Sequence, residues 1–427
     1  MNHSRHRASF GLTLVAVALP VSLWAQGNFE YTNDNVWGAQ GNFVYTNDST
    51  FPFGGNTVSG FSVASTGELT LLPGSPFSTG GTGGDGGYVA SNTITISADR
   101  KFLFASNGKS NDISVFTVDS TTGDLTLVPG SPFATGGTAN CPPPWEQINC
   151  GISLAPTLDG KFLIAANGGS ENLTVFTIGT TGALTPIAGS PFAAADSPDG
   201  IKVSPDNKFL AVAEPDSNQI QIFSIASNGA LTSVETTPGV SGGGLSGVDI
   251  NCFPRWIYGS EYSETTTIVN GGMLSKSGHI TPLEGTPYEP GVGVGSDVVL
   301  IGADLGRKVV FVSNQGGHTP DTYTITVFTA EWDGALHLVP GSPFAMHAAV
   351  APGGMASSSN GKLLYVANLN GAVSVFSVGR GGALTEVEGS PFSTGQYGGL
   401  ESLVAFPPRT FSPFEAWLGG CYANAVQ

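Results

Sequence analysis

Short runs in which apolar and polar residues alternate recur along most of the chain. Examples are "NDISVFTV" (111–118), "ENLTVFTI" (171–178), "NQIQIFSI" (218–225) and "GAVSVFSV" (371–378). Alternation with a period of two is typical of β-strands with one buried face. No stretch with the 3.6-residue period of an amphipathic helix interrupts these runs. The pattern therefore predicts an all-β protein.

Each alternating run belongs to a larger repeated unit. A short strand such as "NTITIS" (92–97) precedes a turn and an apolar strand such as "SADRKFLFASN" (97–107). The alternating run follows, and after a glycine turn comes a phrase such as "LTLVPGSPFATGG" (125–137). Each unit thus holds four predicted strands, which we call A (inner) to D (outer). Phe133 in the phrase is expected to pack between neighbouring units.

The repeated phrase occurs once in each unit, so its copies give the number of units. Its glycine recurs at Gly74, Gly130, Gly189, Gly285, Gly341 and Gly389, and a degenerate copy surrounds Thr236. Successive copies are 47 to 59 residues apart. Seven four-stranded units of this length predict a seven-bladed β-propeller.

The two ends of the repeat region predict how the ring closes. The first unit begins with a B-type strand, "GNFVYTND" (41–48), and lacks a strand A. The last unit is followed by a lone A-type strand, "LESLVAFPP" (400–408). We expect this strand to complete the first blade, because pairing would leave no open sheet edge there. The propeller is then predicted over residues 41–408, with a tail at 409–427.

The first forty residues are predicted to form a leader followed by a short N-terminal arm. Arg5 and Arg7 precede the apolar stretch 10–25, which favours a signal peptide (1–25) cleaved near Ala25. A membrane anchor is the alternative, although the run is short for a spanning helix. Residues 25–35 and 39–49 are near-identical, so 26–40 is expected to be a duplicated arm or, alternatively, an extra edge strand. We therefore predict export to the periplasm or the extracellular medium.

The composition restricts the possible partners. Charged residues make up only 11% of the chain, and the formal net charge is −17. This balance argues against nucleic acid, which requires a basic surface, and against anionic membrane surfaces. No stretch after the leader is apolar enough to span a bilayer, and we expect a monomer.

The repeated strands resemble a known family. "KLLYVAN" (362–368) followed by "VSVFSV" (373–378) and "GALT" (382–385) is similar to the exported seven-bladed lactonase-like propellers with YVTN-type repeats. Catalytic members of that family resemble 6-phosphogluconolactonase and muconate lactonising enzymes. The resemblance implies Arg-His pairs just before strand A and a Glu that ends strand B. Glu214 matches the latter, whereas "PGGM" (352–355) and "DSPDG" (196–200) lack the Arg-His pair.

The topology sorts the charges between two faces. Strands alternate in direction, so the D–A and B–C loops share one face (the top) and the A–B and C–D turns share the other (the bottom). Most Lys and Arg residues fall at bottom turns, which leaves Lys109 and Lys202 for the top. The top instead collects acids: Asp85, Glu146, Asp196, Asp199, Glu214, Asp216, Glu261, Glu264, Asp297 and Asp321.

An acidic funnel repels phosphorylated sugars and carboxylated lactones and attracts cations. Because phosphate recognition usually needs Arg or Lys, this arrangement argues against 6-phosphogluconolactonase activity itself. The alternative interpretation is that these acids only solvate the loops.

A few residues are candidates for chemistry. His318 and His347 lie in top loops and, with Asp321, could bind a metal or act as a general base; the alternative is two surface histidines. The pairs Glu214/Asp216 and Glu261/Glu264 could bind a divalent cation such as calcium, or could be solvated loop acids. We expect no other cofactor.

The four cysteines suggest two disulfides in an exported chain. Cys141 and Cys150 can close the top loop "NCPPPWEQINC" (140–150), where Trp145 and Glu146 would recognise a ligand or Trp145 would pack onto the blade. Cys252 lies at the bottom, and pairing with Cys421 would hold the segment 414–427 across that face.

These observations favour a ligand-binding or interaction module for a small molecule or a protein at the acidic top face. The residues expected at the ligand are Trp145, Glu146, Asp199, Lys202, Glu261, Asp297 and His318. The alternative is a lactone hydrolase with Glu214 and His347 as acid–base groups. A third hypothesis is an enzyme that uses a metal held by top-face carboxylates.

Overall fold

The computed structural model describes most of the repeat region. The described residues are 41–50, 55–84, 92–139, 151–238, 244–251, 255–304, 307–316, 323–347, 351–396 and 398–406. They all lie within one compact unit. None of the helical segments in these ranges has the length and apolarity needed to cross a membrane. The predicted leader, the arm, the tail and all four cysteines lie outside the described residues.

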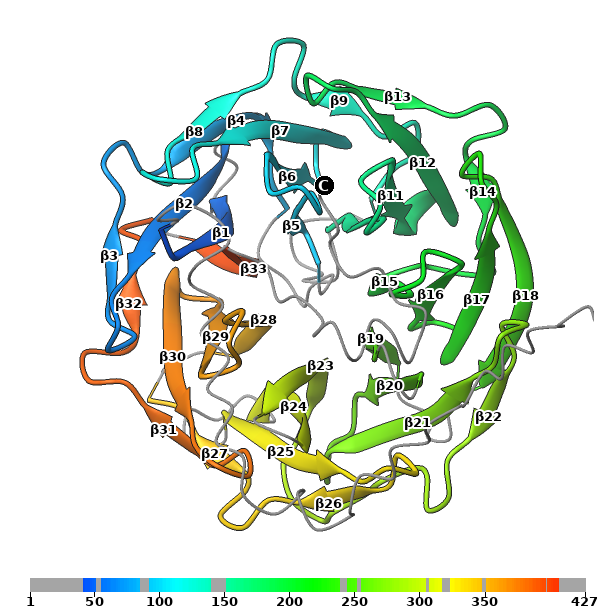
Figure 1. Ribbon diagram of the computed structural model, residues 1–427, viewed down its shortest axis with the longest axis vertical. Helices are drawn as coiled ribbons and strands as arrows, with labels where there is room; N and C mark the ends of the chain where they lie inside the picture. The colour runs from blue at the N-terminus through cyan, green and yellow to red at the C-terminus, as the bar shows by residue number, and fades with distance from the viewer. Residues whose placement is uncertain are drawn as a thin grey trace, which may run out of the picture. The chain divides into compact units, whose positions relative to one another are not determined.

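Seven antiparallel sheets surround a central axis (Figure 1). Their inner strands are β33 (Gly398–Phe406), β5 (Ile94–Ile96), β10 (Ser153–Pro156), β15 (Ile201–Val203), β19 (Leu245–Ile250), β23 (Ser296–Asp304) and β28 (Pro352–Ser357). The second strands are β1 (Phe43–Thr50), β6 (Phe102–Asn107), β11 (Phe162–Asn167), β16 (Phe209–Glu214), β20 (Trp256–Glu261), β24 (Arg307–Asn314) and β29 (Leu363–Asn368). The predicted seven-bladed propeller is confirmed.

The outer half of each blade follows the same order. The third strands are β2 (Gly55–Val63), β7 (Asp112–Val118), β12 (Asn172–Ile178), β17 (Gln219–Ile225), β21 (Ile268–Leu274), β25 (Thr324–Ala330) and β30 (Ala372–Val378). The outer strands are β3 (Leu69–Leu71), β8 (Leu125–Leu127), β13 (Leu184–Pro186), β18 (Leu231–Pro238), β22 (Ile280–Pro282), β26 (Leu336–Leu338) and β31 (Leu384–Glu386). A 3₁₀ turn, η2 (Gly168–Ser170), follows β11.

Five blades contain a short fifth strand. These strands are β4 (Phe77–Thr82), β9 (Phe133–Ala134), β14 (Phe192–Ala193), β27 (Phe344–Ala345) and β32 (Phe392–Ser393). Each pairs with the third strand of its own blade, beside the outer strand. The outer edge is therefore broken into two short pieces, where the sequence predicted a single strand D.

The repeated phrase causes this break. β8 pairs with the end of β7, the chain then leaves the sheet through a cis Ser131–Pro132 peptide, and β9 pairs with the start of β7. The N–H of Val115, in the middle of β7, donates to Ser131 Oγ at 2.8 Å. A buried backbone donor needs a partner, and here the serine supplies it where the strand is interrupted.

The same contact recurs in other blades. The equivalent acceptor is Ser75, Ser190, Thr286, Ser342 or Ser390, at 2.8 to 3.0 Å from the N–H of the third strand. In the fourth blade, where the phrase is degenerate, β18 is instead a continuous eight-residue strand with a register shift beside Ile222. The phrase therefore has a structural role.

The hydrophobic core is divided among the blade interfaces. Each apolar cluster takes its members from two consecutive blades. Between the second and third blades, Phe104 and Val115 pack with Leu163 and Phe176, and the half-buried Phe133 joins them. This confirms the place expected for Phe133.

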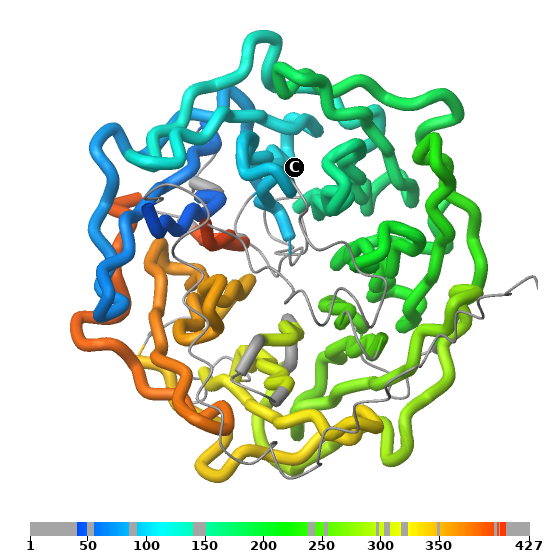
Figure 2. Tube along the Cα trace, in the orientation of Figure 1, coloured from blue at the N-terminus to red at the C-terminus, as the bar shows by residue number. Residues whose placement is uncertain are grey.

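Ring closure also follows the prediction. β1 pairs antiparallel with β33, from Phe43 opposite Phe406 to Thr50 opposite Gly398. The start and end of the described chain consequently lie side by side, blue against red, in Figure 2. β33 also contacts the next blade, because the Ser402 hydroxyl accepts a hydrogen bond from the N–H of Ile94 at 3.1 Å.

Asp48 is a buried carboxylate in this closing blade. It accepts hydrogen bonds from the hydroxyls of Thr46 at 2.5 Å, Thr57 at 3.0 Å and Ser59 at 2.5 Å. These bonds favour the charged form, but burial outweighs them and raises the pKa of Asp48 to about 7.

Replacing the serine of the phrase is expected to destabilise a blade. Ser131→Ala leaves the buried N–H of Val115 without its acceptor, so the free energy of unfolding should fall by about 1–3 kcal/mol. Urea unfolding measures this. Ser131→Thr is the control, since Thr286 makes the same bond in the fifth blade; equal stability of both variants would contradict the role.

The stability of the protein is expected to decrease as the pH rises from about 4 to about 7 because of Asp48. The folded protein holds this proton up to about pH 7, whereas the unfolded chain releases it near the ordinary value of 3.8. The effect is on the order of a few kcal/mol. Asp48→Asn should remove this decrease in urea unfolding between pH 4.5 and 8, whereas Asp216→Asn, at an exposed position, should retain it. An unchanged pH dependence in Asp48→Asn would contradict the assignment.

Candidate functional site

A buried polar residue lies at the top end of each second strand; it is the last residue of the strand in six blades, and in the first blade it is Asp48, two residues before the end of β1. These residues are Asp48, Asn107, Asn167, Glu214, Glu261, Asn314 and Asn368. The asparagines bind hydroxyls of the third strand: Asn107 Nδ2 donates to Ser114 Oγ at 2.8 Å, and Asn368 Nδ2 donates to Ser374 Oγ at 3.0 Å. The polar residue thus stabilises the hairpin between the second and third strands.

Glu214 has this position in the fourth blade. Its side chain is fully buried, Oε2 accepts a hydrogen bond from Gln219 Nε2 at 2.8 Å, and Oε1 accepts one from the N–H of Ala195 at 3.1 Å. Burial raises the pKa of Glu214, against the lowering effect of these hydrogen bonds. The carboxylate therefore joins the β16–β17 hairpin to the loop that enters the blade.

Glu261 and Asp199 are likewise buried in the wall of the ring. Glu261 ends β20 and accepts a hydrogen bond from Asn270 Nδ2. Asp199 precedes β15, and its N–H donates to the carbonyl of Ala213 at 3.0 Å. Asp297 lies at the start of β23, near the top as expected.

Lys202 lies on inner strand β15, as predicted, and makes an ion pair that the sequence did not reveal. Its Nζ lies 2.8 Å from Asp249 Oδ1 on β19, and its side chain is 39% exposed. Asp249 Oδ2 accepts the N–H of Ile301 on β23 at 2.9 Å. Asp249 therefore connects the inner strands of three consecutive blades. The available signal was an acid inside the inner strand "LSGVDI" (245–250), but its partner lies one blade away.

His347 lies at the outer edge of the ring. Its ring Nδ1 contacts Glu386 Oε2, and its N–H donates to the same oxygen at 3.1 Å. Glu386 belongs to outer strand β31 of the seventh blade, whereas Glu214 ends a second strand in the fourth blade. The structure thus does not bring these two candidate acid–base residues together (Figure 1).

Other candidates fall outside the described residues. Trp145, Glu146 and His318 do so, as do Cys141, Cys150, Cys252 and Cys421, so their predicted roles stay predictions. In the described part of the chain, no group of three or more His, Cys, Asp or Glu residues is arranged to hold a metal ion.

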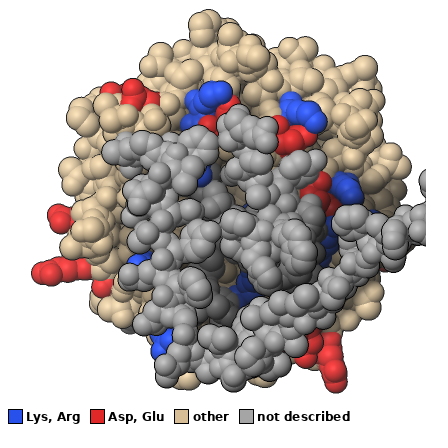
Figure 3. All heavy atoms as spheres, viewed as in Figure 1, with Lys and Arg blue, Asp and Glu red and all other residues tan. Residues whose placement is uncertain are grey.

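The bottom turns neutralise several of the basic residues. Lys101 pairs with Asp99 at 3.2 Å, Lys161 with Asp159 at 2.9 Å, and Arg255 with Asp206 at 2.5 Å. On the face drawn in Figure 3, basic and acidic atoms lie next to each other at several places.

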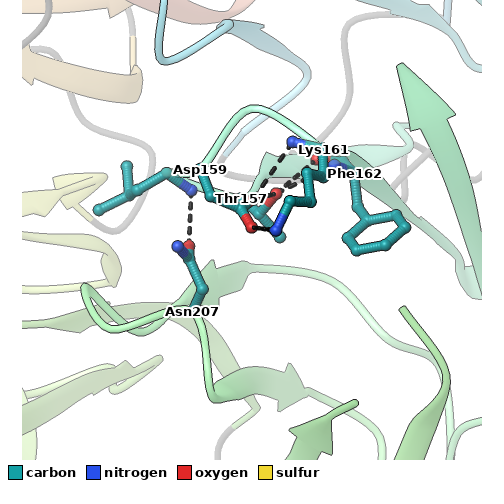
Figure 4. Close-up of polar contacts among 6 residues, drawn as sticks. Thr157, Asp159, Lys161, Phe162 and Asn207 are labelled. Carbon is teal, nitrogen blue, oxygen red and sulfur yellow. Dashed lines mark hydrogen bonds and ion pairs between the residues drawn. The ribbon is translucent and has the colours of Figure 1, made fainter. Parts of the chain in front are cut away.

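One such turn is shown in Figure 4. Thr157 donates to Asp159, which accepts the N–H of Lys161, and Asn207 of the next blade accepts the N–H of Leu158 at 2.6 Å.

Top loops retain exposed acids. Glu171, Asp216, Glu264 and Glu289 are exposed in loops of the top face, together with Lys109. Lys202, the other basic residue predicted for this face, is paired with Asp249. The described part of the top face is therefore acidic at its rim.

Comparison with known proteins agrees with the fold. The model of the lactonase family, a 7-bladed β-propeller, matches residues 54–137 and 137–245. The chain is thus a seven-bladed β-propeller that resembles the lactonase family, as its repeats indicated. A search of curated proteins finds no match.

Several solved structures share this fold. A putative 6-phosphogluconolactonase from Bacteroides fragilis is 20% identical with a TM-score of 0.63, over 85% of this chain and 98% of that chain. A putative 6-phosphogluconolactonase from Bacteroides uniformis is 17% identical with a TM-score of 0.63, over 83% and 98%. The periplasmic gluconolactonase of Pseudomonas aeruginosa is 16% identical with a TM-score of 0.62, over 86% and 99%. At these identities the likeness shows the fold alone.

Removing Asp249 is expected to destabilise the ring more than removing Lys202. Asp249→Ala deprives the N–H of Ile301 and the ammonium of Lys202 of their acceptor, which should cost about 1–3 kcal/mol of unfolding free energy. Lys202→Met should cost less than about 1 kcal/mol, since the lysine is partly exposed. Urea unfolding of both variants measures the difference, and equal losses would show that Asp249 acts only through Lys202.

Proposed function

We propose that this protein is a ligand-binding propeller whose top face takes an uncharged or cationic small molecule. One observation carries the proposal: the polar groups that could have done chemistry in the top wall are engaged in holding blades together. Both oxygens of Glu214 accept hydrogen bonds while the side chain is buried. Groups that are held by such hydrogen bonds are suited to forming a binding surface at the top face.

The charge of the rim supports the proposed class of ligand. Glu171, Asp216, Glu264 and Glu289 are exposed there, and Asp249 neutralises Lys202. A face with this balance of charge attracts cations and repels phosphorylated or carboxylated molecules. Polar and uncharged rings can still bind through hydrogen bonds.

The proposal places the protein outside the cytoplasm. The predicted leader at residues 1–25 supports export, and the similar gluconolactonase from Pseudomonas aeruginosa is periplasmic.

Lactone hydrolysis is the second candidate. It is supported by the match to the lactonase family model and by the position of Glu214 at the end of a second strand. Burial raises the pKa of Glu214, which is the direction that a general acid requires. His347 is too peripheral to assist, so the hydrolase would depend on Glu214 and on groups outside the described residues.

A substrate panel separates the two functions. We expect purified protein to bind uncharged or amino-substituted lactones in calorimetry without hydrolysing them in a pH-stat assay, with or without EDTA. Glu214→Gln should leave this binding unchanged. If the protein is a hydrolase, Glu214→Gln should reduce kcat/KM by about a hundredfold or more.

The matched control is Glu264→Gln, which removes an exposed carboxylate from the same face. Lactone turnover that Glu214→Gln abolishes and Glu264→Gln retains would reverse the order of the two proposals. Turnover that EDTA abolishes would instead favour the metal-dependent enzyme.

A further inference from the structure

A separate cavity lies at the seam where the ring closes. It has a volume of about 260 Å³, and its lining includes Asn42, the turn residues Ala64–Thr66 of the first blade, the turn residues Ser358–Asn360 of the seventh, and Phe406. The first blade has no A–B turn, because its inner strand β33 and second strand β1 come from opposite ends of the repeat region. The bottom of this blade is consequently built differently from the bottoms of the others.

Tyr365 lines this cavity, and its hydroxyl has no hydrogen-bond partner among the described residues. Tyr45 and Tyr258 have equivalent positions on their second strands, and each donates to the carbonyl of the turn glycine of the following blade: Gly123 at 2.8 Å and Gly334 at 2.7 Å. The corresponding glycine for Tyr365 is Gly67. Yet the hydroxyl of Tyr365, a residue that is 2% exposed and lines the cavity, makes no hydrogen bond with Gly67 or with any other residue that the structure describes.

Burial raises the pKa of Tyr365 and so keeps its hydroxyl protonated. The group therefore remains a neutral O–H that can donate at physiological pH. A donor that lines an accessible cavity and has no partner in the described protein is available to a ligand that accepts a hydrogen bond.

Lys362 adds a charge that the equivalent turns neutralise. Lys101 and Lys161 are paired with the aspartates two residues before them. In the seventh blade this position is Asn360, which still accepts from Ser358 Oγ at 2.8 Å and from the N–H of Lys362 at 3.0 Å. The turn is preserved without its negative charge, and within the described ranges the Lys362 ammonium forms no ion pair.

The described residues of the lining thus offer donors and include no Asp or Glu, in a protein with 32 acidic and 15 basic residues. Lys362 and Tyr365 supply a cation and a neutral donor, the hydroxyl of Ser65 supplies another, and Leu363 and Phe406 supply apolar contact. A volume of about 260 Å³ is slightly below the usual range for ligand cavities, about 300–1,000 Å³.

We propose that the seam cavity binds a small organic anion, with its carboxylate or phosphate group between Lys362 and Tyr365 and its apolar part against Leu363 and Phe406. This site is distinct from the acidic top face and does not depend on the function proposed for it. Charge-assisted hydrogen bonds of this kind are the strong ones, which suits recognition by so small a pocket.

Calorimetry of the purified full-length protein with acetate, benzoate and inorganic phosphate tests the site. We expect wild-type protein to bind at least one of these anions, and the tightest one identifies the head group. Lys362→Met and Tyr365→Phe should each weaken that binding about tenfold or more. Absence of binding by all three anions would overturn the proposal.

The sharpest variant is Asn360→Asp. It recreates the Asp–Lys pair found at Asp99/Lys101 and Asp159/Lys161, so the fold should tolerate it while anion binding is lost. Lys161→Met is the matched control, because it removes a paired lysine from an equivalent turn and should leave binding unchanged. Binding that survives Asn360→Asp, or that Lys161→Met abolishes equally, would place the anion elsewhere.

Thermal unfolding without ligand gives a second, independent measurement. Tyr365→Phe removes a hydroxyl that has no partner among the described residues, so the melting temperature should stay the same or rise. Tyr258→Phe removes the hydrogen bond to Gly334 and should lower it. A loss of stability in Tyr365→Phe as large as in Tyr258→Phe would show that the hydroxyl is already satisfied, and the proposal would fail.

Discussion

The antiparallel pairing of β1 with β33 is the constraint on which the rest of the ring depends. Every apolar cluster is shared by two consecutive blades, so no blade holds a complete core of its own. A blade at an open end would expose one apolar face to water, at a cost proportional to its area. Pairing of Phe43 with Phe406 and of the residues that follow brings the first and seventh blades together and gives every blade two neighbours.

Polar residues also connect neighbouring strands and blades. The asparagines and carboxylates at the ends of the second strands stabilise hairpins, and Asp249 contacts residues of the inner strands on both sides of its own. Such contacts engage polar side chains at the top of the ring, so the same groups would have to serve both the fold and any chemistry there. Other polar groups are not engaged in this way: the exposed loop acids at the top, and the side chains of Tyr365 and Lys362 at the seam, which have no polar partner among the described residues.

The fold was predictable from the sequence, and the site was predictable only in part. Period-two alternation, seven copies of the phrase and the two complementary ends defined the blades and their closure. Lys202 was correctly placed on an inner strand, but its ion pair with Asp249 depends on the register between blades, which no local pattern encodes. His347 was assigned to a top loop, yet loop geometry directs it to Glu386 on the outer edge. The break in the outer strand was missed because the serine contact to Val115 joins residues of different strands.

The broken outer strand has a consequence for the protein in solution. A propeller exposes the edge of every blade around its circumference, and a long free edge invites pairing with a strand of another molecule. In six blades the outer strand stops after three residues, and the Ser/Thr-Pro turn carries the chain away from the sheet before it returns. Only β18, at eight residues, offers a longer template among the described outer strands. The repeated phrase thus divides the rim of most blades into short segments, and the longest of the described outer strands is β18 of the fourth blade.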